Sequence, residues 1–382
     1  MNQWHLEHDL RIIRKMGVKW LRTEFDWRKI EPTRGQMRFE WFDTLVRLCA
    51  SMKIRLVPVV VYTPKWVAPR FNLPPEEPQL FSDFVNALVR RYCHYVKHWE
   101  IWNEANSYYF WVGDARQYAT LLELASAAAR RADPQSKILM CGLADPAHPN
   151  TEFLFEVLDH VVKHSVDILN LHAYPGTWND RKIEDWPVLL LALKKRLNEI
   201  GVDKPIWITE TGLASCKNGS QRGSEQGSYL IKAFASLLGS GVAERVFWYR
   251  LKDEVSASPS SKDERFGLLD QDTVFHGCRF AYRGYSRLAR SLPQSFSLLA
   301  GGFLVDKPKP AFEAYTALIR MLGQDFDCVS SRFEDTSSSV SLTLPNGSAR
   351  IFWSNRPGDL PQAMLSNSAP VRLMPCSSQG EV

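Results

Sequence analysis

Short apolar segments recur along most of the chain, and stretches with helical periodicity separate them. Seven of these segments are rich in Val, Ile, Leu or Trp: Val18–Thr23, Ile54–Val61, Lys97–Trp102, Ile138–Cys141, Val166–Leu171, Pro205–Thr209 and Ala243–Tyr249. They lack strict alternation of polar and apolar residues, which is typical of strands covered on both faces. Their starts lie about 30 to 45 residues apart, and strand, helix and strand at that spacing predict right-handed βαβ units and a parallel sheet.

Amphipathic stretches of helical length fill the intervals between these segments. We expect helices over Asp43–Met52, Phe81–Tyr95, Ala115–Ala132, Glu152–His164, Trp186–Ile200 and Glu225–Leu238. Gly17, Gly201 and Gly241 stand at the ends of helical stretches, where glycine commonly stops a helix.

Two architectures fit this alternation of strands and helices. A (β/α)8 barrel has eight strands, one more than the segments marked above. An open doubly wound sheet that binds a nucleotide would carry a glycine-rich turn after its first strand. The segment RTEFDWRKIEP, residues 22–32, offers no such turn. We therefore predict the TIM barrel, and the lack of a phosphate-binding loop disfavours a nucleotide-dependent enzyme.

The pattern changes in the last third of the chain. Asp306–Gly323 has the pattern of a closing helix, and from Gln324 the period becomes that of strands. An Asn-Gly pair at 346–347, between two strand patterns, predicts a hairpin. We predict a barrel over residues 1–323 with an insertion at 273–304, followed by a small β-rich appendage over 324–382 with a disordered tail.

Composition and charge exclude several classes of function. The net charge of +5 comes from interleaved basic and acidic residues, and we find no basic stripe of the kind that nucleic acid requires. No run reaches 18 apolar residues, so we expect no membrane span. Met1 leads directly into a helical pattern without a signal segment, which leaves a cytoplasmic chain or, if its N-terminus is truncated, a secreted one. The sequence does not indicate an oligomeric state.

Cysteine usage gives no sign of a metal site. The seven cysteines are scattered singly, without a C-x-x-C pair or the Cys/His spacing of a zinc site. Their odd number favours reduced thiols over a disulfide framework. We therefore expect no zinc site, and the two-carboxylate chemistry described below needs no metal and no organic cofactor.

Three of the apolar segments end in glutamate, at Glu24, Glu104 and Glu210. Active sites of barrels form at the carboxyl ends of the strands, so these groups should face one mouth. Two carboxyl groups about 5–5.5 Å apart can perform a double displacement at the anomeric carbon of a sugar, one as nucleophile and one as acid/base. At about 6.5–9.5 Å, the same pair would admit a water molecule and invert the configuration.

The segments around two of these glutamates carry a family resemblance. HWEIWNEAN (98–106) and KPIWITETG (204–212) resemble the catalytic strands of glycoside hydrolase clan A, the retaining TIM-barrel glycosidases, with most similarity to families 39 and 5. The segments 21–46, LNLHAYPG, VFWYRL, FGLLD and KPKPAFEAY resemble other parts of those enzymes, so the likeness covers roughly residues 5–322. By that resemblance the segment VKWLRTE is strand two, and no segment before it matches strand one. We expect either that the start is truncated or that another segment fills the place of strand one.

The resemblance implies roles for eight residues. Glu104 matches the acid/base, Glu210 the nucleophile, and Asn103 the residue that hydrogen-bonds the sugar 2-hydroxyl. The other implied substrate-binding residues are Arg22 near the nucleophile, His172 and Tyr174 after strand six, the ring platform Trp248 of strand eight, and Trp66 in the loop YTPKWVAP. Glu24 stays outside the catalytic pair, because no role in the clan matches it.

The sequence thus predicts a retaining O-glycoside hydrolase that acts on a β-linked glycan or glycoside, by resemblance to the clan. A catalytically inactive glycan-binding barrel and a transglycosylase that uses the same two glutamates are the alternatives. The sugar, the linkage and endo or exo action depend on loops such as Tyr62–Pro78, Ser107–Gly113 and Lys252–Phe266, whose shapes the sequence does not reveal.

Overall fold

The computed structural model of the chain describes residues 3–145, 150–161, 163–215, 221–254, 265–275, 302–322, 327–334, 337–344, 347–354, 361–365 and 371–372. The chain divides into two compact units. Unit 1 comprises Met1–Ala173, Pro187–Glu210 and Ser240–Phe247, and unit 2 comprises Tyr174–Trp186, Thr211–Gly239 and Trp248–Val382.

The strands of unit 1 confirm the seven segments predicted from the sequence. They are β1 (Trp20–Asp26), β2 (Arg55–Val61), β3 (His98–Ile101), β4 (Lys137–Leu139), β5 (Leu169–Ala173), β6 (Ile206–Thr211) and β7 (Ala243–Trp248). β1 to β4 pair in sequence order and parallel, and β5 to β7 follow in the same order. A parallel bridge between Leu139 and Ile168 joins the two groups. The unit is therefore an α/β structure with its strands in chain order.

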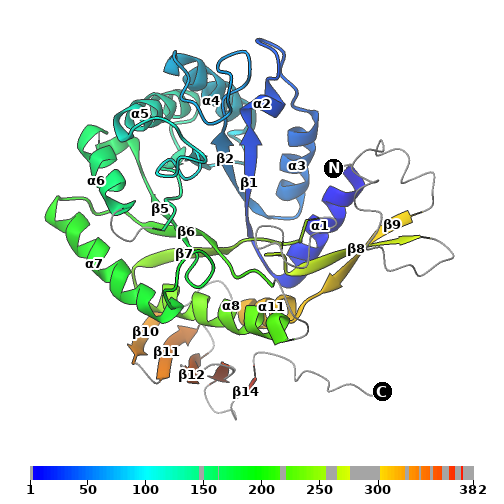
Figure 1. The fold of residues 1–382 in the computed structure, drawn as a ribbon. Helices are drawn as coiled ribbons and strands as arrows, with labels where there is room; N and C mark the ends of the chain where they lie inside the picture. Colours follow the sequence, from blue (N-terminus) through cyan, green and yellow to red (C-terminus); the bar gives the residue numbers. More distant parts are fainter. Residues whose placement is uncertain are drawn as a thin grey trace. The chain divides into compact units, whose positions relative to one another are not determined.

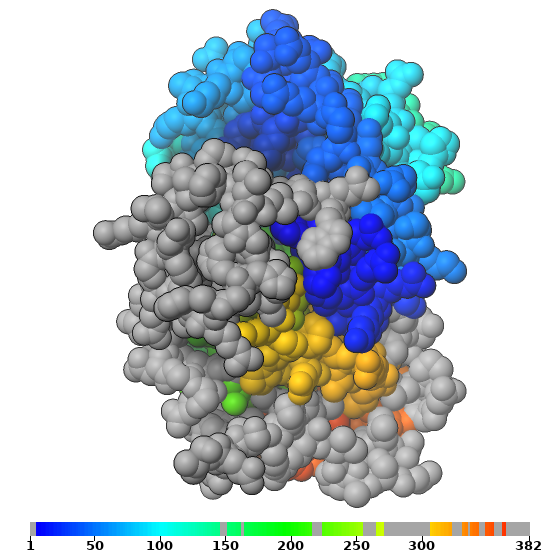
Figure 2. All heavy atoms as spheres, turned by 90° about the vertical axis from the view of Figure 1, so that its right-hand side faces the viewer, coloured from blue at the N-terminus to red at the C-terminus, as the bar shows by residue number. Residues whose placement is uncertain are grey.

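Helices lie between successive strands and on the outside of them, as the ribbon in Figure 1 shows for α3 to α7. The helices of unit 1 are α1 (Gln3–Met16), α2 (Trp27–Ile30), α3 (Glu40–Ser51), α4 (Pro78–Tyr92), α5 (Ala115–Ala132), α6 (Asn150–His160), the short η1 (Lys163–Ser165) and α7 (Trp186–Glu199). Asp114 and Gln117 form a reciprocal capping box that starts α5. α1 packs beside α3 and reaches the surface, in dark blue in Figure 2.

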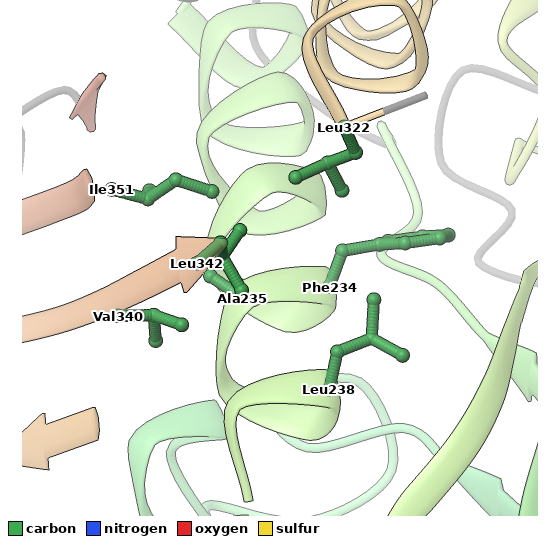
Figure 3. Close-up of a pocket in the computed structure, with 7 residues that line it drawn as sticks. All are labelled: Phe234, Ala235, Leu238, Leu322, Val340, Leu342 and Ile351. Atoms are coloured by element: carbon green, nitrogen blue, oxygen red, sulfur yellow. The ribbon is translucent and has the colours of Figure 1, made fainter. Parts of the chain in front are cut away.

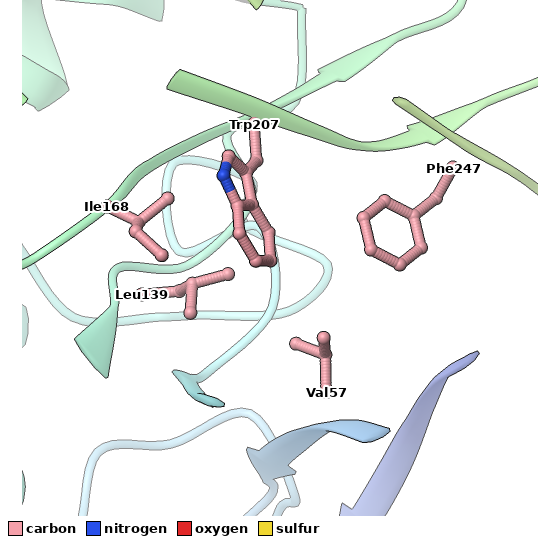
Figure 4. Close-up of a cluster of buried hydrophobic side chains, with 5 residues drawn as sticks. All are labelled: Val57, Leu139, Ile168, Trp207 and Phe247. Carbon is pink, nitrogen blue, oxygen red and sulfur yellow. The ribbon is translucent and has the colours of Figure 1, made fainter. Parts of the chain in front are cut away.

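Side chains from several strands of unit 1 meet in one buried cluster. A buried cluster combines residues from β2, β4, β6 and β7 with one beside β5: Val57, Leu139, Ile168, Trp207 and Phe247 (Figure 4). Trp20 of β1 packs against this cluster, edge-on to Trp207 with ring centroids 5.3 Å apart. The sheet therefore curls around an internal core, because the rings of its first and sixth strands touch.

Unit 2 contains helices and antiparallel sheets. Its elements are η2 (Ile183–Asp185), α8 (Gln221–Gly239), β8 (Leu269–Phe275), β9 (Gly302–Pro308), α11 (Pro310–Leu322), β10 (Asp327–Phe333), β11 (Ser337–Leu344), β12 (Gly347–Ser354), β13 (Gln362–Leu365) and β14 (Val371–Arg372). β8 pairs with β9, and β10 to β14 form one sheet in chain order. β11 and β12 pair antiparallel across 345–346, which confirms the predicted hairpin.

Apolar side chains of α8, α11, β11 and β12 enclose a small gap within unit 2 (Figure 3). It lies between Phe234 and Leu238 of α8 and the strand residues Val340 and Ile351. Most of the predicted insertion, the boundary predicted at 323/324 and the predicted disordered tail lie outside the described residues. None of the helices in the described part of the chain has the length and apolarity that a membrane crossing requires.

Candidate active site

Arg22 joins three of the site residues through its guanidinium group. Nε and Nη2 donate to the two oxygens of Glu100, at 2.7 and 2.8 Å. Nη1 donates to Glu210 Oε1 at 2.5 Å, and Nη2 also donates to Asn103 Oδ1 at 2.9 Å. A planar guanidinium with a fixed set of donors can hold two carboxylates at once, which a lysine could not do in this geometry. Arg22 therefore orients Glu210 relative to β1 and β3.

Glu100 is a fully buried carboxylate beneath this arginine. Besides the two bonds from Arg22, it accepts the backbone N–H of Gly142 at 3.1 Å. Burial alone would lower the pKa of Arg22, but the adjacent carboxylates of Glu100 and Glu210 raise it above its ordinary value. The arginine is thus a permanent positive charge in the floor of the site.

His172 lies between the two glutamates that the sequence singled out. Its Nδ1 is 2.6 Å from Glu104 Oε1 and 3.6 Å from Glu210 Oε2. Burial favours the neutral ring, but Glu210 and Glu104 outweigh it and raise the pKa of His172 above its ordinary value.

The other nitrogen of His172 faces Thr209, whose hydroxyl oxygen is 3.3 Å from Nε2. The Thr209 hydroxyl donates its hydrogen to Asn170 Oδ1 at 2.7 Å. Its oxygen is therefore left to accept from Nε2–H, which places a proton on Nε2 of His172. Nδ1 is then free to donate to an ionised Glu104 or to accept from a protonated one.

Gly142 makes room for the histidine ring. A Cβ atom at this position would lie 2.0 Å from His172 Nε2, a collision that the buried ring could not relieve by a small shift. The carbonyl oxygen of Gly142 also accepts the backbone N–H of Glu104 at 3.0 Å. Gly142 therefore acts on both members of the Glu104–His172 contact. Its lack of a side chain admits the His172 ring, and its carbonyl oxygen holds the backbone of Glu104.

The backbone after β3 is strained where it presents the site residues. Trp102 and Glu104, on either side of Asn103, have positive φ angles of 71° and 40°. Such conformations cost on the order of 1–3 kcal/mol each and persist only where the surroundings hold them. The buried Trp102 is held by its Nε1–H, which donates to the Phe110 carbonyl oxygen at 2.9 Å.

One carboxylate oxygen of Glu104, one of Glu210 and one ring nitrogen of His172 all lie within 4.8 Å of one another. A carboxylate oxygen of Glu104 and one of Glu210 are therefore no more than 4.8 Å apart. Two facing carboxylates with a histidine between them could act as a catalytic carboxyl pair, and the same three atoms could also surround a metal ion.

Three further predicted site residues are described by their own contacts. Trp66 belongs to the loop after β2, where its Nε1–H donates to the Glu31 carbonyl oxygen at 2.8 Å and its ring meets Trp27 edge-on. Tyr174 and Trp248 belong to unit 2, where both contact Phe266. Their roles as sugar platforms or donor-subsite residues stay predictions.

Sequence reasoning missed Glu100, Gly142, Asn170 and Thr209. Glu100 alone carried a signal, because a carboxylate flanked by Trp99 and Ile101 in an apolar strand must find a buried cation. Glu24, which sequence reasoning left without a role, is exposed and accepts the Tyr62 hydroxyl at 2.8 Å.

Two family models match parts of the chain. Residues 124–272 match the family model "Glycosyl hydrolase catalytic core", and residues 1–74 match the family model "Beta-galactosidase". No curated protein sequence matches the chain.

Solved structures of glycoside hydrolases share the fold. A family 39 glycoside hydrolase from Bacteroides cellulosilyticus WH2 has a TM-score of 0.69 at 19% identity, over 92% of this chain and 68% of that one. A family 39 β-xylosidase from Caulobacter crescentus has a TM-score of 0.60 at 15% identity, over 91% and 73%. A glucosidase from Croceicoccus marinus has a TM-score of 0.62 at 15% identity, over 90% of this chain and 70% of that one. The matched catalytic core and the shared fold identify the chain as a glycosidase that resembles the clan A glycoside hydrolases.

Proposed function

We propose that this glycosidase is a retaining O-glycoside hydrolase, which cleaves a β-linked glycan or glycoside through a covalent glycosyl-enzyme intermediate. The observation that carries the proposal is the approach of Glu104 and Glu210 to within 4.8 Å, with His172 between them. Retaining enzymes hold their two carboxyl groups about 5–5.5 Å apart, whereas inverting enzymes need about 6.5–9.5 Å for an intervening water.

Glu210 is the proposed nucleophile. The permanent charge of Arg22, 2.5 Å away, favours its ionised form and fixes the direction of its Oε1. Glu210 Oε2 is the proposed attacking atom: its bond to the anomeric carbon forms the glycosyl ester as the bond to the leaving oxygen breaks.

Glu104 is the proposed acid/base. It first donates its proton to the leaving oxygen and then takes one from the water that attacks the ester. His172 suits the protonated state, because with the ring proton on Nε2 its Nδ1 can accept from protonated Glu104. Asn103, oriented by Arg22, is placed next to Glu104 to bind the sugar 2-hydroxyl.

The proposed fold is a (β/α)8 TIM barrel in which β1 to β7 correspond to strands two to eight and the sheet curls so that β1 approaches β6 and β7. The approach of Trp20 to Trp207, and of the Arg245 guanidinium to the Trp20 ring at 4.6 Å, supports this arrangement, since both join β1 to the far end of the sheet.

The test is hydrolysis of aryl β-glycosides, beginning with the xyloside and the glucoside that the names of the structural relatives suggest. We expect Glu210→Gln to reduce kcat/KM on every substrate by about 10³-fold or more, and Glu104→Gln to do so on glycosides whose leaving group needs a proton. Glu199→Gln, at the exposed end of α7, is the matched control and should keep full activity. The anomeric configuration of the first product, followed by NMR, should be that of the substrate.

A first product of inverted configuration would show that Glu210 acts as a general base and not as a nucleophile. An active Glu210→Gln variant would refute the assignment of Glu210 as a catalytic residue. Products transferred to an added sugar acceptor, in place of free sugar, would identify a transglycosylase with the same intermediate.

A further inference from the structure

Two adjacent tyrosines stand almost fully in solvent close to the proposed acid/base. Tyr108 and Tyr109 are 71% and 69% exposed, and they follow Glu104 by four and five residues. A chain of five residues spans at most about 18 Å, so both rings lie within reach of a short glycan bound at Glu104. Paired exposed aromatic rings beside a reactive group are a common sign of a binding surface.

The backbone that carries these rings is firmly held. The buried amide of Asn72 donates to the carbonyl oxygens of both Tyr108 and Tyr109, at 3.1 and 3.0 Å. The Asn72 carbonyl oxygen accepts the N–H of Val112 at 2.9 Å, and the N–H of Ser107 donates to the Glu104 carbonyl oxygen at 2.8 Å. The exposure of the tyrosines is therefore built into the loop, because polar contacts fix its backbone from below.

The ring of Tyr109 is supported by other aromatic rings. It lies edge-on to Phe110, with centroids 4.8 Å apart, and edge-on to Phe71 at 6.3 Å. Phe71 belongs to the loop after β2, so two loops combine to support one exposed ring. A ring held in this way loses little conformational entropy when a flat ligand stacks on it.

We propose that Tyr108 and Tyr109 form a stacking platform for the sugar on the leaving-group side of the cleaved bond. The proposal rests on the function proposed above, in which Glu104 protonates the leaving oxygen and thus marks the side on which the leaving sugar lies. The loop that carries the two rings follows directly on Glu104. The ligand class is a β-linked oligosaccharide, so the enzyme acts on glycans with at least one sugar beyond the cleaved bond.

Two substrates with the same reacting sugar test the platform. A β-glycosyl fluoride has one atom as its leaving group and cannot reach the tyrosines, whereas a β-linked oligosaccharide can. We expect Tyr108→Ala and Tyr109→Ala each to lower kcat/KM on the oligosaccharide by about tenfold, the effect of one stacked ring. Both should leave kcat/KM on the fluoride within twofold of wild type, and the Tyr→Phe variants should keep activity on both substrates.

Tyr95→Ala is the matched control, since Tyr95 is 65% exposed but precedes β3, at the amino end of that strand. This variant should leave kcat/KM unchanged on both substrates. Unchanged oligosaccharide hydrolysis in the double alanine variant would refute the platform. An equal loss of kcat/KM on both substrates would also refute the platform, because it would show that the substitutions act on the reacting groups and not on the leaving sugar.

A binding assay separates this proposal from the proposed function. Affinity electrophoresis through gels that contain soluble β-glucan or xylan measures contact with a glycan without turnover. If the gel retards the wild type but not the double alanine variant, the result would support the platform even if neither substrate were hydrolysed. A wild type that neither hydrolyses the oligosaccharide nor is retarded would overturn it.

Discussion

At the scale of single residues, the site depends on a buried pair of opposite charges. Arg22 and Glu100 bond to each other twice, and Glu100 has no exposed surface. Removal of one partner of such a pair leaves an uncompensated charge in the interior, which costs more than the pair itself contributes. Stability and catalysis can therefore be separated here, because Arg22 donates to Glu210 whereas Glu100 is bonded to Arg22 and to the backbone of Gly142.

We predict that Arg22→Met will lower the free energy of unfolding by about 3–5 kcal/mol, because Glu100 stays buried without its cation. The double variant Arg22→Met/Glu100→Leu should recover more than half of that loss, as both charges are gone. Both variants should have low activity, since Glu210 has lost the hydrogen bond from Arg22 in both. Urea unfolding and initial rates check the two expectations; a double variant less stable than Arg22→Met would contradict the account.

At the scale of elements, the strands could be predicted and their inward contacts could not. Each strand carries a local signal, a run of Val, Ile, Leu or Trp with a helix on either side, and the ends of β1, β3 and β6 pointed to the glutamates. The partners of Glu104 depend on which strands lie side by side. Asn170, Thr209 and Gly142 come from three separate segments, and no local pattern marks them as neighbours of one histidine.

The segment after β4 yields a second prediction, because the ring of His172 occupies the space of the missing Cβ at Gly142. Gly142→Ala should displace His172 and break its 2.6 Å contact with Glu104. We expect kcat/KM to fall by about 10²-fold on substrates whose leaving group needs a proton, and much less on aryl glycosides with acidic phenols.

Gly35→Ala provides the control for that variant. Gly35 has a φ of 77° with no atom within 4 Å of an added Cβ, so the change strains the backbone without touching the site. It should lower stability by about 1 kcal/mol and leave both classes of substrate unaffected. An equal loss of activity on both classes in Gly142→Ala would contradict a role through Glu104.

At the scale of the whole molecule, stability should depend on pH through a histidine in the core of the curled sheet. His98 stacks on Trp207 with ring centroids 5.3 Å apart and meets Trp20 edge-on. Burial, followed by the positive charge of Arg245, lowers the pKa of His98 to about 4. In the unfolded chain the pKa returns to about 6.5, so only the unfolded chain gains this proton between those values.

His98 therefore contributes its full stability above about pH 6.5 and loses it as the pH falls toward 4, by roughly 3 kcal/mol in total. His98→Phe keeps an aromatic ring against Trp207 and removes the titration. We expect the free energy of unfolding of the wild type to fall relative to this variant by that amount between pH 6.5 and 4, measured by urea unfolding. His172 titrates in both proteins and cancels from the difference. A difference that stays constant with pH would show that His98 is protonated in the folded protein and that the core at the first, third and sixth strands admits a charge.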